Sequence, residues 1–179
     1  GKTSVIYNIQ NSTNRGRTGK GKTTAAVGQV IRAAGSGLKV LMFQFMKNNS
    51  SSERAILEQI PNVTCLPGRD KIKFYNQMNS DERAELKHYN TKALDEIIKF
   101  CSPFDVLFLD EILCAVSLNL LNEDKLMSFL EHKPRGLEII MTGHEVSDRI
   151  IRASDYVTEM KKVKHPYDKG QSAREGIEY

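Results

Sequence analysis

The sequence predicts an α/β fold with one doubly wound, mostly parallel sheet and helices on both faces of that sheet. Apolar runs of strand length alternate with segments of helical period along the chain, an order typical of parallel sheets. The runs at 39–45, 105–110 and 137–143 are almost continuously apolar, as strands buried on both faces require. The chain has 179 residues, 40% of them hydrophobic, so we expect a single domain over 1–179.

Six segments have the length and apolar content of strands. They lie at 4–9, 39–45, 62–66, 105–110, 137–143 and 156–160. The segment 22–34 between the first two strands follows a helical pattern. Two stretches rich in Asn and Ser, 10–15 and 48–52, predict flexible loops.

The clearest helix covers 80–101, because apolar side chains recur there at steps of three and four residues. Asn79 and Glu82 have the spacing of a capping box at its start. A further helix is expected after Asn122 and before the KPRG sequence at 133–136. The residues expected to face the core are Leu86, Tyr89, Ala93, Leu94, Ile97, Ile98 and Cys101 in the first of these helices and Leu126, Phe129 and Leu130 in the second.

Composition excludes several classes of protein. The 26 basic and 22 acidic residues give a net charge of +4, and the basic residues are spread along the chain, which argues against a nucleic-acid partner. No long apolar run and no signal peptide are present, so we expect a soluble, cytoplasmic protein without a membrane partner. Cys65, Cys101 and Cys114 are far apart and odd in number, so they predict reduced, mostly buried thiols, neither a zinc site nor a disulfide framework.

The sequence GRTGKGKT at 16–23 matches the phosphate-binding motif G-x-x-x-x-G-K-[ST]. The motif lies between a predicted strand and a predicted helix, which is the context that a phosphate loop requires. Its glycines let successive backbone N–H groups face one anion, and the following helix adds its positive end. We expect Lys22 to reach phosphate oxygens and the Thr23 hydroxyl to bind Mg²⁺. A glycine-rich turn without a ligand is the alternative.

Two acids at the end of the apolar strand 105–110 are expected to form the second half of this site. Asp110 ends the strand and Glu111 comes next. Acids at the carboxyl end of a central strand face the crevice where open α/β sheets bind ligands, and paired carboxylates hold Mg²⁺ directly or through water. The alternative is an acidic N-cap for the next helix. Together with the glycine-rich loop, the acids predict a P-loop NTPase-like domain whose metal ligands are Thr23, Asp110 and Glu111.

Three stretches carry a resemblance to a known family. They are 19–47 (GKGKTTAAVGQVIRAAGSGLKVLMFQFMK), 105–121 (DVLFLDEILCAVSLNLL) and 139–179, which ends in VKHPYDKGQSAREGIEY. Together they resemble the phosphate-loop class of ATP:corrinoid adenosyltransferases over most of the chain. The ending is the rarest of the three pieces, and generic phosphate-loop ATPases have no such ending.

The resemblance implies a reaction in which Co(I) of cobalamin or another reduced corrinoid attacks C5′ of MgATP and expels the whole triphosphate. Such a leaving group needs its charge held by a preorganised cluster and a bound metal ion. The corrinoid supplies the nucleophile, so a catalytic Ser, Cys or His is not expected, and the catalytic roles go to Lys22, Thr23 and Glu111. The residues expected to hold the nucleotide are Gly19, Lys20, Gly21, Lys22, Thr23 and Thr24.

The family places aromatic side chains beneath the corrin ring to displace its lower ligand, because four-coordinate cobalt(II) is easier to reduce. The matching stretch is 70–79, which offers Phe74 and Tyr75. Ile72 stands where another aromatic residue is usual in the family. The alternative is that both aromatic side chains pack against the domain.

The resemblance extends to further positions around the expected crevice. Gln44 and Lys47 match the pattern QF-x-K and are expected on the crevice rim, with a solvated lysine as the alternative. Glu53 and Arg54 match a Glu-Arg pair, with a surface ion pair as the alternative. The remaining positions are Thr142, expected to touch phosphate, His144, where Arg is common, and Lys164, His165, Asp168 and Gly170, expected to fold over the nucleotide or the ring.

By the same resemblance we expect a homodimer and an electron donor such as a flavoprotein reductase. Two other functions fit the phosphate motif. A phosphoryl-transfer ATPase or small-molecule kinase would yield ADP. A non-catalytic regulatory module would bind ATP without turning it over.

Overall fold

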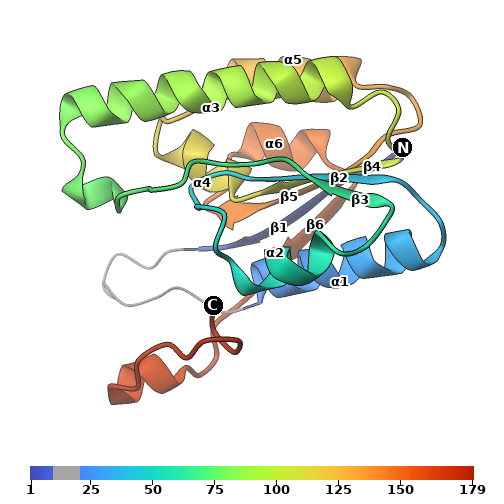
Figure 1. The fold of residues 1–179 in the computed structure, drawn as a ribbon. Coiled ribbons are helices and arrows are strands. Elements are labelled where there is room, and N and C mark those ends of the chain that lie inside the picture. The colour runs from blue at the N-terminus through green and yellow to red at the C-terminus, as the bar shows by residue number, and fades with distance from the viewer. Residues whose placement is uncertain (10–20) are drawn as a thin grey trace.

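The computed structural model describes residues 1–9 and 21–179 (Figure 1). All six expected strands are present, as β1 (Thr3–Asn8), β2 (Val40–Gln44), β3 (Val63–Cys65), β4 (Val106–Asp110), β5 (Glu138–His144) and β6 (Tyr156–Glu159). They form one sheet in the order β3-β2-β4-β5-β1-β6, and every pairing between them is parallel. The predicted parallel α/β sheet is therefore confirmed.

Helices cover both faces of the sheet (Figure 1). One face carries α1 (Lys22–Gly35) and α2 (Ser52–Leu57), and the other carries α3 (Ser80–Phe100), α4 (Ile112–Ser117), α5 (Glu123–His132) and α6 (Asp148–Ala153). Two short 3₁₀ turns, η1 (Tyr75–Gln77) and η2 (Pro166–Lys169), complete the elements. The three helices expected from periodicity are α1, α3 and α5. None of the helices in the described part of the chain is long and apolar enough to cross a membrane.

The alternation of side chains along the central strands divides the core into two layers. In β4, Val106 and Phe108 pack with α1, whereas Leu107 and Leu109 pack with the helices of the opposite face. The strand β2 alternates in the same way. Because successive side chains of a strand point to opposite faces, a continuous apolar run fills both layers at once.

The long helix α3 starts at the expected capping box. The Asn79 side chain accepts a hydrogen bond from the Glu82 backbone N–H at 2.8 Å, and the Glu82 carboxylate accepts one from the Asn79 backbone. One expected core residue is wrong, because Ile98 is 37% exposed. Its neighbour Ile97 is buried, as expected. Neighbouring residues of a helix lie about 100° apart around the axis, which places Ile98 toward the edge of the buried face.

The free thiols lie largely inside the protein, as expected. Cys101 and Cys114 are buried, Cys65 is partly buried, and all three are unpaired by disulfides. Of the two expected loops, 10–15 lies outside the described residues. The other leads into α2 and is tied to the chain near Gly68, whose backbone exchanges hydrogen bonds of 2.7 and 3.1 Å with the Asn49 side chain.

The strand order sets the layout of the site. The strand β5 lies between β1, which precedes the phosphate motif, and β4, which ends in Asp110. At the end of β5, Gly143 allows α4 to approach closely, since a Cβ atom there would lie 2.6 Å from the Cys114 backbone nitrogen. All of the strands are parallel, so their carboxyl ends gather at one edge of the sheet.

We therefore expect Gly143→Ala to lower the free energy of unfolding by about 2 kcal/mol or more, because backbone atoms of α4 would have to move. Thermal or urea denaturation measures this loss. The matched control is Gly28→Ala inside α1, where no described atom lies within 4 Å of the added methyl group. The control should be neutral or stabilising by up to about 1 kcal/mol. Equal stability of the two variants would contradict the packing described here.

Candidate active site

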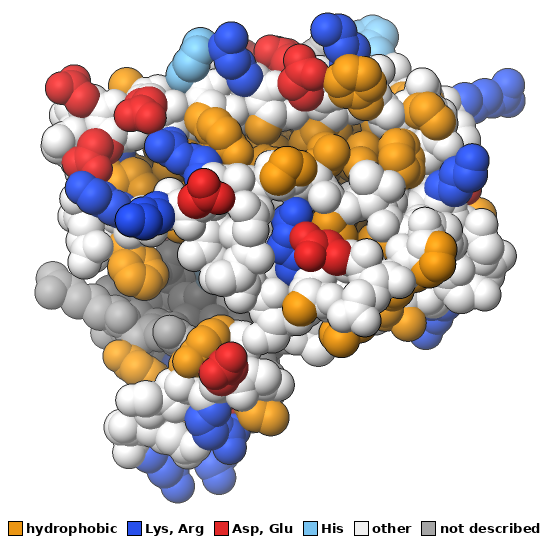
Figure 2. Space-filling model, in the orientation of Figure 1, with side chains coloured by type: hydrophobic (Ala, Val, Ile, Leu, Met, Phe, Trp, Pro, Cys, Tyr) orange, Lys and Arg blue, Asp and Glu red, His pale blue; other side chains and the backbone are white. Residues whose placement is uncertain are grey.

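A cavity of about 1030 Å³ opens at the carboxyl edge of the sheet. Its walls are the start of α1, the loop between β2 and α2, the segment before η1 and the last residues of the chain. In Figure 2 the C-terminal segment forms a lobe below the body of the molecule. The last residues of the phosphate motif, Gly21, Lys22 and Thr23, and the acid Glu111 thus face one shared space.

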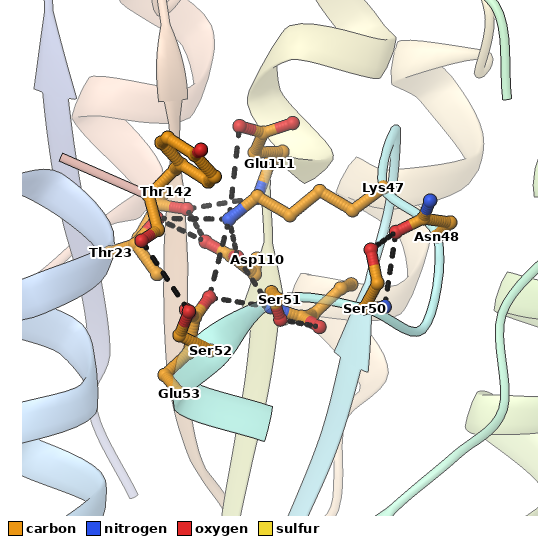
Figure 3. Close-up of polar contacts among 12 residues, drawn as sticks. Thr23, Lys47, Asn48, Ser50, Ser51, Ser52, Glu53, Asp110, Glu111 and Thr142 are labelled. Atoms are coloured by element: carbon orange, nitrogen blue, oxygen red, sulfur yellow. Dashed lines mark hydrogen bonds and ion pairs between the residues drawn. The ribbon is translucent and has the colours of Figure 1, made fainter. Parts of the chain in front are cut away.

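The carboxylate of Asp110 lies at the centre of the polar contacts beside this cavity (Figure 3). It is fully buried and accepts four hydrogen bonds from side chains. Thr23 Oγ1 at 3.0 Å and Thr142 Oγ1 at 2.7 Å bind Oδ1. Lys47 Nζ at 2.7 Å and Gln44 Nε2 at 3.2 Å bind Oδ2. One carboxylate therefore ties together α1, β2, β4, β5 and the loop after β2.

Thr142 connects the two acids. Its hydroxyl donates to Asp110 and accepts a 2.9 Å hydrogen bond from the backbone N–H of Glu111. Glu111 has a left-handed backbone, with φ 58° and ψ 15°, as the chain turns from β4 into α4. The side chain of Thr142 is fully buried and does not line the cavity, so it positions Asp110 and Glu111 from beneath.

Lys47 brings a positive charge to the same place. The left-handed turn at Met46, with φ 59°, reverses the chain after β2 and directs Lys47 back over the strand ends. Its Nζ lies 2.7 Å from Asp110 Oδ2, 3.6 Å from Glu53 Oε1 and 4.0 Å from Glu111 Oε1. Burial lowers the pKa of Lys47, but the carboxylates of Asp110 and Glu111 outweigh it and the net shift is upward. The ammonium group is therefore held in its charged form.

The expected rim position of Gln44 is wrong, because its side chain is only 3% exposed. Its amide group donates to Asp110 and, at 2.9 Å, to Glu53 Oε1, and its carbonyl oxygen accepts from Ser51 Oγ. The alternative for Glu53 and Arg54, a surface ion pair between them, is not what the structure shows. Arg54 is buried and binds Glu58 at 2.7 Å, one helical turn away, whereas Glu53 faces Lys47.

The surroundings shift the pKa values of three groups in this cavity. Burial lowers the pKa of Lys22, which nearby acids partly offset. Burial raises the pKa of Glu111 to about 7, with Lys47 opposing the shift and Asp110 adding to it. Burial, reinforced by Lys22, lowers the pKa of His144 to about 4, so its ring is neutral at pH 7 and is hydrogen-bonded to Asn8.

The other predicted residues divide between the cavity and its surroundings. Gly21, Thr24, Phe74 and His165 line the cavity, and Phe74 is 75% exposed there. Tyr75 does not line it and instead packs against the core with its ring 4.0 Å below the Arg83 guanidinium.

Three further predictions lie away from the cavity or outside the described residues. Asp168 binds Lys162 at 3.0 Å and is not among the cavity-lining residues. Gly19 and Lys20 lie outside the described residues, as do the first positions of the phosphate motif.

Sequence reasoning did not single out some of the cavity walls. The stretch Gly176–Tyr179 lines the cavity, and Ser52 Oγ binds the Tyr179 backbone oxygen at 3.4 Å. Ser51, which binds Gln44, was also not expected. The only signal for the first was the rare ending of the chain. Ser51 has no signal of its own, because a serine in a loop rich in Asn and Ser does not reveal that it binds Gln44.

The donor atoms around Lys47 fit Mg²⁺. Thr23, Asp110 and Glu111 offer hydroxyl and carboxylate oxygens, the ligands that Mg²⁺ prefers, and an ammonium group already lies among them. Among residues 1–9 and 21–179, no group of three or more His, Cys, Asp or Glu side chains is placed to hold a metal ion.

The sequence is similar to those of known corrinoid adenosyltransferases. A family model described as ATP:corrinoid adenosyltransferase BtuR/CobO/CobP matches residues 14–179. The corrinoid adenosyltransferase of Escherichia coli (strain K12) is 32% identical over 162 residues, covering 90% of this chain and 81% of that protein. Corrinoid adenosyltransferase CobA of Salmonella typhimurium (strain LT2) is 31% identical over 166 residues, with the same two coverages.

Solved structures share the fold. The cytoplasmic domain of EssC superposes with a TM-score of 0.53 at 16% identity, over 98% of this chain and 37% of that chain. A structure of EssC ATPases 2 and 3 from Geobacillus thermodenitrificans gives a TM-score of 0.50 at 13% identity, over 99% of this chain and 36% of that chain. These likenesses concern the α/β fold alone. The family match, which spans nearly the whole chain, decides the relationship: the chain belongs to the ATP:corrinoid adenosyltransferase family.

Proposed function

We propose that this protein transfers the 5′-deoxyadenosyl group of ATP to Co(I) of a reduced corrinoid and releases triphosphate. The family match over residues 14–179 carries the proposal. The site supports it, since a nucleotide-sized cavity borders both the start of α1 and an exposed aromatic side chain. A volume near 1030 Å³ is at the upper end for small-molecule sites, which suits two substrates that meet.

The reaction needs charge stabilisation and orientation from the protein. The electron pair of Co(I) forms the Co–C5′ bond, and the pair of the breaking C5′–O bond leaves with the triphosphate. Negative charge thus develops on the bridging oxygen, and preorganised positive groups lower the barrier most effectively there. The protein does not have to supply a nucleophile or a proton, because the substrates contain the reacting atoms.

The phosphate side of the cavity has the groups for this task. The Lys22 ammonium group lines the cavity at the first turn of α1, where the helix adds its positive end. Thr23, Asp110 and Glu111 are the residues that would hold Mg²⁺, which supplies positive charge to the departing triphosphate. Thr142 keeps the two acids in place through its paired hydrogen bonds.

The corrin side is formed by different residues. Ile72 and Phe74 line the cavity, and Phe74 is exposed enough to lie flat against a large planar ligand. Tyr75 is held by Arg83 and packs inward. We propose that Phe74 contacts the corrin ring, whereas Tyr75 fixes the loop that presents it.

We also propose that the 179 residues form one catalytic domain that works in the cytoplasm as a homodimer, with a flavoprotein reductase as electron donor. The resemblance to the family supports these assignments.

Product analysis tests the proposed reaction. The protein is incubated anaerobically with ATP, a strong reductant and cob(II)alamin or cobinamide. We expect intact triphosphate and a shift of the corrinoid spectrum, both dependent on the corrinoid. Orthophosphate and ADP formed regardless of corrinoid would indicate an ATPase or kinase, and no turnover with ATP bound would indicate a regulatory module. Either result would overturn the proposal.

Removing the Lys22 charge should slow the transfer by at least about 100-fold, because the departing triphosphate loses a preorganised cation. The variant is Lys22→Ala, measured by the rate of triphosphate release. Lys39→Ala is the matched control, since Lys39 is exposed and precedes β2 at the opposite edge of the sheet. A similar loss in both variants would contradict the placement of the triphosphate beside Lys22.

Thr142→Val should reduce both stability and activity, because valine has the same shape but removes both hydrogen bonds of the hydroxyl. We expect the free energy of unfolding to fall by about 1–3 kcal/mol and the transfer rate to fall roughly tenfold. Urea denaturation and the triphosphate assay measure these effects. Thr64→Val, on the exposed side of β3, is the control and should stay within about 0.5 kcal/mol. Unchanged activity of Thr142→Val would show that the bridge does not position the acids.

Stability should depend on pH through Glu111. Because burial raises its pKa from 4.5 to about 7, the folded protein keeps a proton in this range that the unfolded chain has released. The free energy of unfolding should therefore fall, relative to Glu111→Gln, as the pH rises from 4.5 to 7, and the difference should be constant above that range. Denaturation of both proteins across this range, without metal or nucleotide, measures the trend. A difference that grows with pH would have the wrong sign.

A further inference from the structure

We propose that Lys47 is an internal cation that occupies the magnesium position until the nucleotide arrives. It weakens the binding of divalent cations that arrive without a nucleotide and moves aside when Mg²⁺ enters with ATP. The inference rests on the proposed function, because that function defines the metal ligands. It adds a role for a residue whose expected place was only the crevice rim.

The contacts of the ammonium group support this role. Lys47 Nζ lies 2.7 Å from Asp110 Oδ2 and 3.4 Å from Thr23 Oγ1, two of the three groups proposed to bind Mg²⁺ (Figure 3). The third, Glu111, is 4.0 Å away. A cation at the centre of these oxygens cannot coexist with a second one there, because like charges a few ångströms apart repel strongly.

The burial of Asp110 explains why a resident cation is needed. The carboxylate is fully buried, and the Glu53 carboxylate lies nearby, 3.6 Å from the Lys47 ammonium group. A buried ion without a charged partner is strongly destabilising. The hydrogen bonds from Thr23, Thr142 and Gln44 satisfy the carboxylate oxygens, but Lys47 is the residue of this group that neutralises them. Lys47 can therefore leave only when another cation replaces it.

The surroundings of Lys47 allow such a movement. Its side chain lines the cavity and is partly exposed, and the neighbouring wall is formed by the small polar residues Asn48, Ser50 and Ser51. A lysine carries its charge on a flexible four-carbon stem, so the ammonium group can turn into the cavity without a backbone change. There the ammonium group would face the polyphosphate and stabilise its negative charge.

This arrangement favours Mg²⁺ bound to ATP over free Mg²⁺. A free divalent cation has to displace Lys47 from its 2.7 Å contact with Asp110, and it brings no new anion for the ammonium group. The nucleotide complex remains anionic after Mg²⁺ has bound, so its phosphate oxygens can accept the displaced ammonium group. The site would then select against a metal ion that arrives without a nucleotide. Such an ion would otherwise occupy the place that the nucleotide's own metal ion needs.

Manganese binding to the nucleotide-free protein tests the proposal, with Mn²⁺ as a paramagnetic substitute for Mg²⁺ measured by EPR. Lys47→Met should bind Mn²⁺ at least about tenfold more tightly than the unmodified protein, because the competing cation is gone. Lys47→Arg keeps the charge and should bind as weakly as the unmodified protein. Lys73→Met is the matched control, since Lys73 also lines the cavity but pairs with Glu82 at 2.7 Å. Equal Mn²⁺ affinity of Lys47→Met and the unmodified protein would overturn the proposal.

A second measurement needs no substitution and decides the matter if Lys47→Met does not fold. The unmodified protein is treated with an amine-acylating reagent, with and without saturating Mn²⁺, and labelled lysines are quantified by mass spectrometry. Lys47 should react several times faster with Mn²⁺, because the ion releases it from Asp110, whereas Lys73 should be unchanged. No change at Lys47 would overturn the proposal. Neither experiment uses ATP or corrinoid, so their failure is distinguishable from failure of the adenosyl transfer.

Discussion

The buried carboxylate of Asp110 is the constraint on which the rest of the site depends. A charged group without solvent must be fully hydrogen-bonded and neutralised, and here Thr23, Thr142, Gln44 and Lys47 meet that requirement together. These four side chains come from separate elements of the sheet edge. The carboxylate thus fixes the start of α1, where the phosphate motif ends, relative to the strands that carry the acids. The contacts that stabilise the buried carboxylate therefore also position the residues proposed to bind the nucleotide.

The strand order gives this network its form. The strand β5 lies between β1, which precedes the phosphate motif, and β4, which ends in Asp110. The hydroxyl of Thr142 in β5 donates a hydrogen bond to Asp110 and accepts one from the backbone N–H of Glu111. Two residues on, the strand ends at His144, whose backbone N–H binds Cys114 Sγ in α4 at 3.3 Å. Gly143 between them makes room for that helix. Close packing behind the site therefore holds Glu111 in its left-handed turn, facing the cavity.

The sheet, the longer helices and part of the site were predictable from the sequence. The short helices and the contacts within the site were not, for physical reasons. The six strands and the helices α1, α3 and α5 were predicted because their periodicity extends over several turns or a full apolar run. The helices α2, α4 and α6 have six residues each, too few to show a period. Among the site residues, Lys22 and Asp110 follow from local motifs. The contact of Lys47 with Asp110 depends on β2 lying beside β4, which no local pattern encodes.

The central claim is that one anionic pocket holds a cation at all times and exchanges Lys47 for the nucleotide's metal, so that the triphosphate is gripped and C5′ is left open to cobalt. A crystal structure with MgATP measures this directly. The account predicts a metal ion at Thr23 and Asp110, the Lys47 ammonium group turned to the phosphates, and C5′ facing the side of the cavity that carries Phe74. A structure in which Lys47 still binds Asp110, with the γ-phosphate pointing toward Phe74, would contradict it.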